Sequence, residues 1–300
     1  MVEKNKYEKK FRICIPTAGV GSRIKEHTNG LNKSLIPINN KAAISHIINL
    51  FPNNCEFVIP IGYKGNLVKQ YLQLAHPKKK FFFVKIKNYD LKGSGLGLTL
   101  LDAKKYLQCP FIFISCDTLI KGKIDLKPDH NWVGYSTTRA SNNYRKIEIG
   151  KKKLIKNFLK KKQTKKNSRN YIGLAGIYNF REFWNCMENN RLKSVPEGEV
   201  FGLNYLKKFG IKSYKYQWYD IGNIESYKLS LKKFKENKNN YNILIKNNEC
   251  IWFNENIVIK YFKDYGIINK RVLRSKKLQG YIPKILNKKK HMYSYEKFDG

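Results

Sequence analysis

The chain has 300 residues, with 60 Lys and Arg against 22 Asp and Glu, and a formal net charge of +38. Hydrophobic residues at 42% and aromatic residues at 14% provide enough apolar surface for a folded core, which excludes an intrinsically disordered chain. No run approaches the roughly 18 apolar residues that a membrane-spanning helix needs. The charged N-terminus and the short run FRICIP do not fit a signal peptide. We therefore expect a cytoplasmic protein.

The cysteines, histidines and lysines say little about partners. The six cysteines are scattered without paired spacing, and the five histidines lack metal-binding spacing, which argues against a disulfide framework or a zinc finger. The positive charge suits nucleic acid, an anionic membrane surface or a phosphate-rich substrate. However, the excess is nearly all Lys, and with abundant Asn and Ile it is also what an AT-rich genome would encode.

The first 125 residues alternate short apolar runs with stretches of helical periodicity. This order predicts an α/β domain with a doubly wound, mostly parallel sheet, in which ligands bind at the carboxyl ends of the strands. The predicted strands are residues 11–16, 55–62, 81–88 and 110–115, and the predicted helices are 41–51, 65–75 and 97–107.

The remaining chain has a different character. Residues 126–225 predict an α+β region, with strands at 132–138, 171–180 and 214–222 and helices near 182–191 and 201–209. The lysine-rich stretch 151–170 is either a solvated loop or hairpin, or a loop that faces phosphate or nucleic acid. Residues 231–240 predict a linker, and the pattern after it predicts a β-hairpin that turns near Asn254–Asn256 and is followed by a basic helix.

A glycine-containing turn follows the first predicted strand. Glycines let the backbone approach an anion, and Arg23 and Lys33 supply positive charge for phosphates. The turn matches neither the P-loop nor the dinucleotide-binding fingerprint. It reads Thr17-Ala18-Gly19-Val20-Gly21-Ser22-Arg23.

This turn with Lys33 resembles the GxGxR…PK signature of the sugar-phosphate nucleotidyltransferase family, of the glucose-1-phosphate thymidylyltransferase type. Three further stretches fit at the right intervals, GSGLG, PFIFISCDTLI and WYDIGNIESY, and the resemblance covers about residues 10–230. It implies a Rossmann-like nucleotidyltransferase fold that binds Mg²⁺ through Asp117 and Asp220. The catalytic residues would be Arg23 on the β- and γ-phosphates and Lys33 on the leaving pyrophosphate. The implied nucleotide-binding residues are Ala18, Gly19, Gly21, Ser22, Ser94 and Gly95.

The chemistry of such a reaction requires these residue types. Two anions must meet when a phosphate oxygen attacks the α-phosphorus of a nucleoside triphosphate, so cations must offset the repulsion and hold the geometry. Magnesium prefers one or two carboxylates with water and phosphate oxygens. No general base is required, because the attacking phosphate is already ionised.

The acceptor side is less defined in the sequence. By resemblance, Gly173 and Gly176 line the sugar, and Glu197 or Glu199 binds its hydroxyls; the alternatives are glycines required by sheet packing and a surface glutamate. Two features depart from the family pattern. Asn32 stands where proline is usual, and the E-K-P segment has no clean counterpart, although Lys160–Lys162 are near.

The last sixty residues resemble part of another family. IVIKYFKD, VLRSKKLQGYIPKIL and MYSYEKFDG resemble the N-lobe of choline kinases and aminoglycoside phosphotransferases, with Lys260 as the lysine that contacts ATP phosphates. The HxDxxxxN catalytic loop is absent, so we expect a longer bifunctional protein; a small hairpin-plus-helix appendage is the alternative. The implied domains are 1–230 for the nucleotidyltransferase, 231–240 for the linker and 241–300 for the kinase-like fragment.

The sequence therefore predicts a Mg²⁺-dependent nucleotidyltransferase. It would join CTP or UTP to a sugar 1-phosphate and release pyrophosphate, as in the synthesis of surface polysaccharide precursors. The alternatives are a CTP:phosphocholine or other alcohol-phosphate cytidylyltransferase, a basic RNA-binding protein and a catalytically silent regulatory protein. The resemblance also allows a homodimer.

Overall fold

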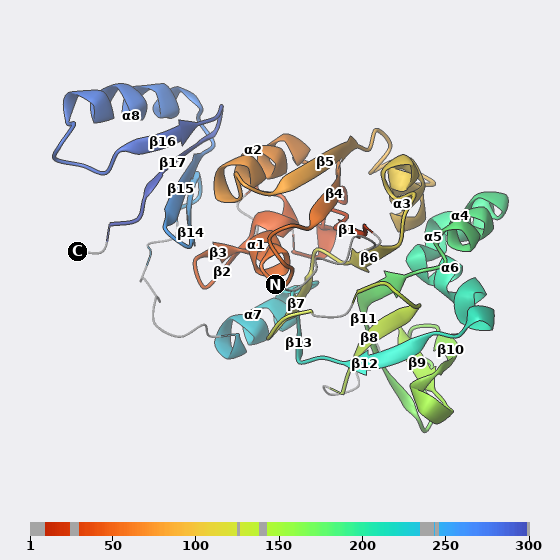
Figure 1. Cartoon of the computed structure of the whole chain (residues 1–300). Coiled ribbons are helices and arrows are strands. Elements are labelled where there is room, and N and C mark those ends of the chain that lie inside the picture. Colours follow the sequence, from red (N-terminus) through yellow and green to blue (C-terminus); the bar gives the residue numbers. More distant parts are fainter. Residues whose placement is uncertain are drawn as a thin grey trace, which may run out of the picture.

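A nine-stranded sheet forms the centre of the molecule (Figure 1). The computed structural model describes residues 10–24, 30–124, 127–137, 143–234, 243 and 246–298. One half of the sheet is parallel, in the order β6-β1-β4-β5. These strands are β1 (Arg12–Cys14), β4 (Glu56–Ile61), β5 (Lys80–Lys85) and β6 (Phe111–Ile114).

The other half of the sheet begins where β11 pairs antiparallel with β6. It continues from β11 to β9 and β10 along one path, and from β11 to β8 and β12 along another. The fold is thus the predicted α/β class, and its parallel pairing is concentrated in the first half. The added strands are β8 (Trp132–Ser136), β9 (Lys146–Ile149), β10 (Ile155–Leu159), β11 (Ser168–Ile177) and β12 (Lys212–Lys215).

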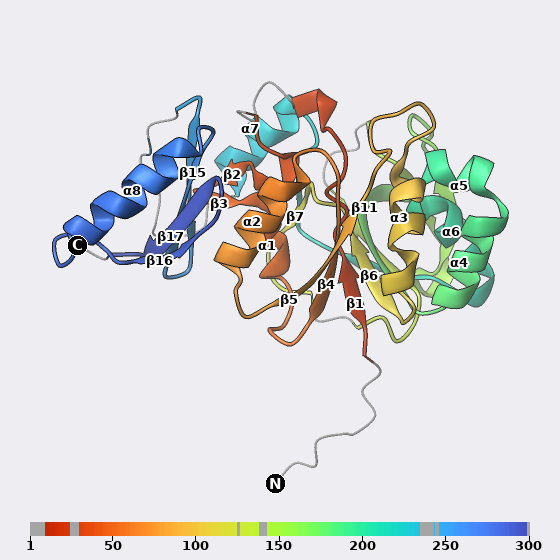
Figure 2. The same cartoon turned by 90° about the horizontal axis from the view of Figure 1, so that it is seen from above.

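Helices cover both faces of the sheet because successive strand residues point to opposite sides. In β1, Ile13 packs in the cluster that contains α1 (Ala43–Ile48) and α2 (Gly65–Ala75). The adjacent Cys14 packs in the cluster on the opposite face, which Figure 2 shows from above. The helices of that face are α3 (Leu96–Ala103), α4 (Phe180–Asn189), α5 (Arg191–Glu197) and α6 (Glu199–Leu206).

Several short 3₁₀ helices and two-stranded pairs lie outside the central sheet. The 3₁₀ helix η2 (Lys33–Leu35) precedes the two-stranded pair β2 (Pro37–Ile38) and β3 (Lys41–Ala42), and β7 (Thr118–Ile120) pairs antiparallel with β13 (Trp218–Asp220). Among the described residues, three more one-turn 3₁₀ helices are η3 (Lys104–Tyr106), η4 (Lys151–Lys153) and η5 (Lys207–Phe209).

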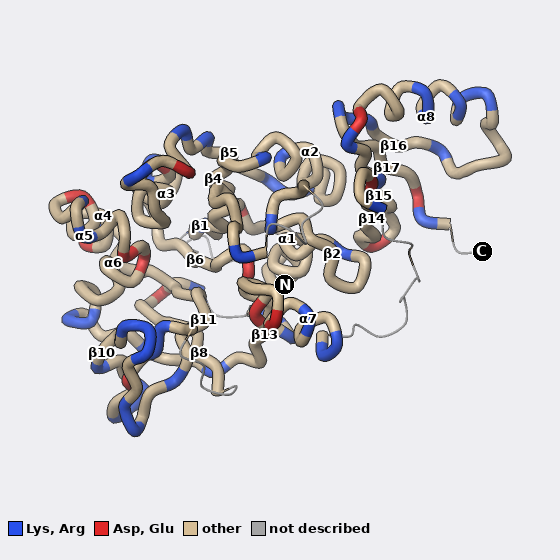
Figure 3. The backbone as a smooth tube through the Cα atoms, turned by 180° about the vertical axis from the view of Figure 1, so that it is seen from behind, with Lys and Arg blue, Asp and Glu red and all other residues tan. Residues whose placement is uncertain are grey.

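The lysine-rich stretch forms a hairpin, which was one of the two sequence interpretations. Strand β10 returns antiparallel to β9, and Figure 3 shows basic residues gathered around these two strands. Helix α7 (Ile224–Lys233) contains the first three residues of the expected linker, and residues 235–240 lie outside the described part of the chain. Among the described residues, no helix is long and apolar enough to span a bilayer.

The described residues 246–298 form a C-terminal module, a four-stranded antiparallel sheet in the order β14-β15-β17-β16. The expected hairpin and basic helix are both present. The module packs beside α2 and the β2–β3 pair (Figures 1 and 2), and Trp252 and Ile259 belong to the same apolar cluster as α1 and α2. Its elements are β14 (Glu249–Asn254), β15 (Ile257–Phe262), α8 (Gly266–Lys277), β16 (Ile285–Lys288) and β17 (Met292–Glu296).

Candidate active site

The glycine-containing turn after β1 is fixed to the neighbouring strand β4. The Thr17 N–H donates to the Pro60 carbonyl at 2.8 Å, and the Ala18 carbonyl accepts from the Tyr63 N–H at 2.9 Å. Gly21 has a φ of +67°, and a Cβ there would lie 3.2 Å from the Cβ of Lys33. A glycine is therefore required both by the backbone conformation and by the close approach of Lys33.

Asn32 fastens this turn to the helix that carries Lys33. Its side-chain amide donates to the Thr17 carbonyl at 2.9 Å and to the Tyr63 carbonyl at 2.7 Å. Its side-chain oxygen accepts from the Ser34 N–H at 2.9 Å and so caps η2. Asn32 is 1% exposed. The residue that departs from the family pattern thus has a structural role of its own at this position.

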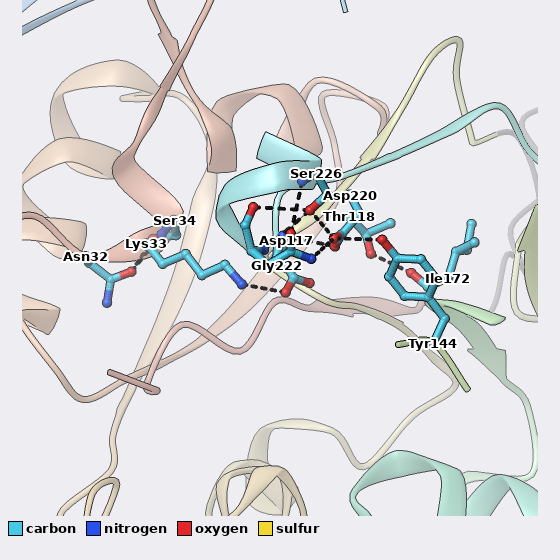
Figure 4. Close-up of polar contacts among 11 residues, drawn as sticks. Asn32, Lys33, Ser34, Asp117, Thr118, Tyr144, Ile172, Asp220, Gly222 and Ser226 are labelled. Atoms are coloured by element: carbon cyan, nitrogen blue, oxygen red, sulfur yellow. Dashed lines mark hydrogen bonds and ion pairs between the residues drawn. The ribbon is translucent and has the colours of Figure 1, made fainter. Parts of the chain in front are cut away.

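Lys33, Asp117 and Asp220 meet beyond the end of β6 (Figure 4). The Lys33 ammonium lies 2.6 Å from an oxygen of Asp117. A Cβ built on Gly222 would lie 3.3 Å from that same Asp117 oxygen and 2.8 Å from an oxygen of Asp220. The two carboxylates therefore face one small space, and the absence of a side chain at Gly222 keeps that space open.

Asp220 is held by groups that sequence reasoning missed. One carboxylate oxygen accepts from the Gly222 N–H at 3.0 Å, and the other accepts from the Ser226 hydroxyl at 2.5 Å and the Tyr144 hydroxyl at 3.1 Å. Ser226 also completes the capping box of α7 with Asn223. The Asn-x-x-Ser spacing signals a helix start, but no sequence pattern links Tyr144 to Asp220.

Burial and charge oppose each other in this cluster. Burial would raise the pKa of Asp117, but Lys33 and then Arg23 lower it to about 2. Burial would likewise lower the pKa of Lys33, but Asp117 raises it above the usual value. Burial, followed by the charge of Asp117, raises the pKa of Asp220. Arg23 is exposed, and its charge reaches Asp117 from the glycine-containing turn.

The GSGLG stretch, residues 93–97, resembles a base-recognition turn of the nucleotidyltransferase family and packs tightly against α5. A Cβ on Gly95 would lie 2.5 Å from the Val195 carbonyl oxygen, and one on Gly97 would lie 2.0 Å from the Ser194 carbonyl oxygen. Both are closer than any real contact, so side chains at these positions would displace α5. Ser94 lies within this stretch, and its N–H donates to the Leu91 carbonyl at 2.9 Å.

A second polar cluster lies at the start of α6. Glu199 is 6% exposed, and burial raises its pKa to about 7 despite the opposing charge of Arg145. Tyr171 is also 6% exposed, and burial and then Glu199, with which its hydroxyl interacts, raise the pKa of Tyr171, although within the described part of the chain the hydroxyl makes no hydrogen bond of ordinary geometry. The Asp117 charge also raises the pKa of Glu199, which relates this cluster to the carboxylate pair.

The other acceptor candidates lie differently. Glu197 is exposed at the end of α5. A Cβ on Gly176 would lie 2.1 Å from the Trp132 indole nitrogen, so packing against Trp132 accounts for this glycine without a ligand. Gly173 has a φ of +68° and lies against Ser115, close to the carboxylate end of the site. The structure therefore brings Lys33 together with the two aspartates, whereas Gly176 packs against Trp132 and Glu197 is exposed.

Comparisons with known proteins agree with this fold. The chain is 28% identical over 215 residues to a bifunctional protein GlmU of Methanococcus maripaludis strain C5, covering 68% of this chain and 50% of that protein. It is 23% identical over 212 residues to the GlmU of Methanocaldococcus jannaschii, with the same coverage. The chain thus spans about half the length of these curated relatives. No protein-family profile matches the sequence.

Solved structures share the architecture at low sequence identity. A UDP-glucose pyrophosphorylase complexed with UDP-glucose has a TM-score of 0.60 and 18% identity, covering 76% of this chain and 98% of its own. The CTP:phosphocholine cytidylyltransferase LicC of Streptococcus pneumoniae has a TM-score of 0.61 and 14% identity, covering 75% and 100%. These likenesses confirm the nucleotidyltransferase-type α/β fold that the sequence predicted.

Proposed function

We propose that this chain is a nucleotidyltransferase that joins a nucleoside triphosphate to a phosphorylated acceptor and releases pyrophosphate. The observation that carries the proposal is the convergence of Lys33, Asp117 and Asp220 beside the glycine-containing turn. The similarity to the GlmU proteins and the shared fold support it.

The site would act mainly through charge and position. An oxygen of the acceptor phosphate bonds to the α-phosphorus, while the bond from that phosphorus to the bridging oxygen breaks and its electron pair leaves with pyrophosphate. Arg23 would bind the outer phosphates, and Lys33 would stabilise the charge that develops on the leaving group. The backbone of the turn at Ala18, Gly19 and Gly21 would approach the phosphates closely.

The carboxylate pair fits a magnesium ion. Asp117 and Asp220 present oxygens to one space, which Gly222 leaves open, and two carboxylates match the ligand set that Mg²⁺ prefers. When bound, the ion would neutralise phosphate charge. Lys33, which pairs with Asp117 in the structure, would then be available for a phosphate oxygen. Asp220 would be kept in orientation by Tyr144 and Ser226.

The acceptor side favours an acceptor phosphate that carries an uncharged polyhydroxyl group, such as a sugar 1-phosphate. Glu199 and the Tyr171 hydroxyl that interacts with it are buried groups that hydroxyls of a ligand could satisfy. Burial raises the pKa of both groups, and Arg145 opposes this rise. Because buried groups that can bond with ligand hydroxyls suit a sugar, a sugar phosphate with CTP or UTP as the donor is favoured over the phosphocholine alternative, and such products suit surface polysaccharide synthesis.

The test is a thermal-shift series with CTP, UTP, dTTP, ATP and GTP, each with and without Mg²⁺. A ligand at 100 times its dissociation constant stabilises a protein by about 2.7 kcal/mol. We expect a magnesium-dependent shift with one pyrimidine nucleotide, followed by pyrophosphate release with a sugar 1-phosphate but not with phosphocholine. No shift with CTP, UTP or dTTP would contradict the proposal, whatever the result with ATP, and salt-sensitive RNA binding would then favour the RNA-binding alternative.

A second proposal concerns the C-terminal module, which we infer to be a kinase-like N-lobe scaffold. Its support is the strand order β14-β15-β17-β16, with α8 inserted between β15 and β16 and Lys260 on β15. Protein kinases pair the corresponding lysine with a helix glutamate. Helix α8 has no acidic residue, and burial and then its Arg271 lower the pKa of Lys260. An ATP-dependent thermal shift that Lys260→Ala abolishes is expected; a shift unchanged by that substitution would contradict the inference.

A further inference from the structure

The short helix that carries Lys33 depends on a residue far along the chain. Helix η2 has three residues, so it has few internal hydrogen bonds to hold its backbone. The carbonyl at its end, that of Leu35, accepts from the Trp252 indole N–H at 2.9 Å, and this bond is buried. A buried carbonyl without a partner is unfavourable, so the indole satisfies a group that the helix cannot satisfy itself.

Trp252 is itself firmly placed. It is 0% exposed, and its ring meets that of Tyr71 edge to face at a centroid distance of 5.0 Å. The Tyr71 hydroxyl bonds with Ser45 at 2.8 Å, so Tyr71 is anchored as well. The indole is therefore a rigid support for Leu35.

Strand β14 makes two further hydrogen bonds to the first domain, from the two residues that follow Trp252. The Phe253 N–H donates to the Asn40 carbonyl, in the turn between β2 and β3, at 2.7 Å. The Asn254 side chain donates to the Ala75 carbonyl at the end of α2 at 2.6 Å. Three successive residues thus fix β14 to η2, to the β2–β3 turn and to α2.

We propose that Trp252 is a positioning residue for Lys33, so that the C-terminal module is a working part of the transferase site. This inference rests on the proposed function and goes beyond it. The Lys33 ammonium must lie within hydrogen-bond distance of its partners, and it stands at 2.6 Å from Asp117. A shift of about 1 Å in a catalytic group can reduce the rate about 100-fold. Leu35 is two residues from Lys33 in the same helical turn. Loss of the hydrogen bond to the Leu35 carbonyl would therefore loosen the backbone that positions Lys33.

A matched tryptophan gives the control. Trp184 is 1% exposed, and its indole N–H donates to the Leu107 carbonyl at 3.0 Å, on the face of the sheet formed by α3 and α4. The substitutions Trp252→Phe and Trp184→Phe, each in the full chain, remove the same kind of bond and similar volume. They differ in whether the bond supports the turn that carries Lys33.

We expect both substitutions to lower the melting temperature by similar amounts, but only Trp252→Phe to lower kcat. The decrease should be at least tenfold, with the KM for the nucleotide changed less than about twofold. Amide hydrogen exchange of Ser34–Ile36 should accelerate in Trp252→Phe alone, and this measurement does not depend on activity. Equal kcat values and equal exchange in the two variants would overturn the inference.

Failure of the variant to fold and failure of the proposed function can each be distinguished from failure of the inference. If Trp252→Phe does not fold, 3-benzothienylalanine at position 252 keeps the ring size but lacks the N–H, and the same loss of kcat and exchange protection is expected. If the wild-type chain releases no pyrophosphate with any donor and acceptor, the proposed function fails. The exchange comparison still decides whether Trp252 holds the Lys33 turn, and unchanged exchange overturns the inference.

Discussion

The carboxylate end and the acceptor end of the site differ in how far their polar groups are satisfied. At the carboxylate end, Asp117 pairs with Lys33, and Asp220 accepts from Gly222, Ser226 and Tyr144. At the acceptor end, the Tyr171 hydroxyl makes no hydrogen bond of ordinary geometry among the described residues, and burial raises the pKa of Glu199.

This difference indicates which end of the site has its polar groups hydrogen-bonded before a substrate binds. Satisfied polar networks are rigid, whereas a buried polar group without a partner is an unfavourable state that a ligand can relieve. Under the proposed function, the carboxylate end would therefore be preorganised for the phosphates that every nucleotide donor carries. The acceptor end retains buried polar groups that can still form hydrogen bonds with a ligand, and these bonds would discriminate one acceptor from another.

The strongest test of the preorganised end is Asp117→Asn. Removing a charge from a site that stabilises phosphate charge should lower kcat by about 10³-fold, with the fold retained. Pyrophosphate release and circular dichroism provide the measurements. Asp129→Asn, at an exposed residue paired with His130, is the control and should remain fully active. More than a tenth of wild-type activity in Asp117→Asn would remove this residue from the machinery.

The next test concerns Asn32, which joins the glycine-containing turn to η2. Asn32→Ala leaves the Thr17 and Tyr63 carbonyls without their partner, which should cost about 2 kcal/mol of unfolding free energy and weaken nucleotide binding. Urea unfolding and nucleotide-dependent thermal shifts measure the two effects. Asn131→Ala also removes buried bonds, to Asn179, but should leave nucleotide binding unchanged. Equal nucleotide affinity in both variants would contradict the assignment.

At the acceptor end, the pKa of Glu199 gives a pH signature. Above a pH of about 7 the carboxylate is ionised and accepts stronger hydrogen bonds, so the acceptor KM should fall about fivefold as pH rises through 7. Glu199→Gln should lose that portion of the pH dependence and retain only the part due to the acceptor phosphate. Steady-state kinetics between pH 5.5 and 8.5 measure it, and identical profiles would exclude Glu199 from acceptor binding.

The same titration affects stability with a defined sign. The folded-state pKa of Glu199 is raised, so its protonation favours the folded protein. Its contribution is fully present below the ordinary value of 4.5 and is lost as pH rises through about 7. Glu199→Gln should therefore flatten the decline in unfolding free energy over that interval, as urea titrations at several pH values would measure. An unchanged slope would contradict the raised pKa.

The smallest expected effect is that of Tyr171→Phe. Removing a buried hydroxyl that makes no hydrogen bond of ordinary geometry should leave the unfolding free energy unchanged or raise it by up to about 1 kcal/mol, while the acceptor KM rises a few-fold. Tyr71→Phe is the control, because the Tyr71 hydroxyl is bonded to Ser45 and its loss should destabilise the protein. Destabilisation of similar size in both variants would mean that Tyr171 has a structural partner.

Much of the parallel half of the fold could be predicted from local patterns. The apolar runs that became β4 and β6 are buried along their whole length, and the helix predicted at 65–75 matches α2. The positions of Asp117 and Asp220 at neighbouring strand ends also agree with the sequence. These features depend on short-range periodicity, or on a resemblance that preserves spacing.

The remaining site residues could not be found in this way. Tyr144 reaches Asp220 across 76 residues, and Trp252 reaches Leu35 across 217. Neither contact can be recognised from the periodicity of the sequence, because each depends on how elements far apart in the chain pack together. Gly176 is a case in which the sequence suggested a role that the structure does not require. It lies in a strand that was expected to line the sugar, but close packing against the Trp132 indole accounts for the glycine.

The contact of Trp252 with Leu35 also implies that the central sheet can fold during synthesis before the helix that carries Lys33 is supported. The ribosome makes the strands of the first domain before it reaches residue 252, and 217 residues separate the two partners. Domains fold as they emerge, so a nascent chain can build its sheet while the turn that carries Lys33 still lacks its support. The proposed transferase activity should therefore reach its full level late in translation, after the last quarter of these 300 residues has begun to emerge.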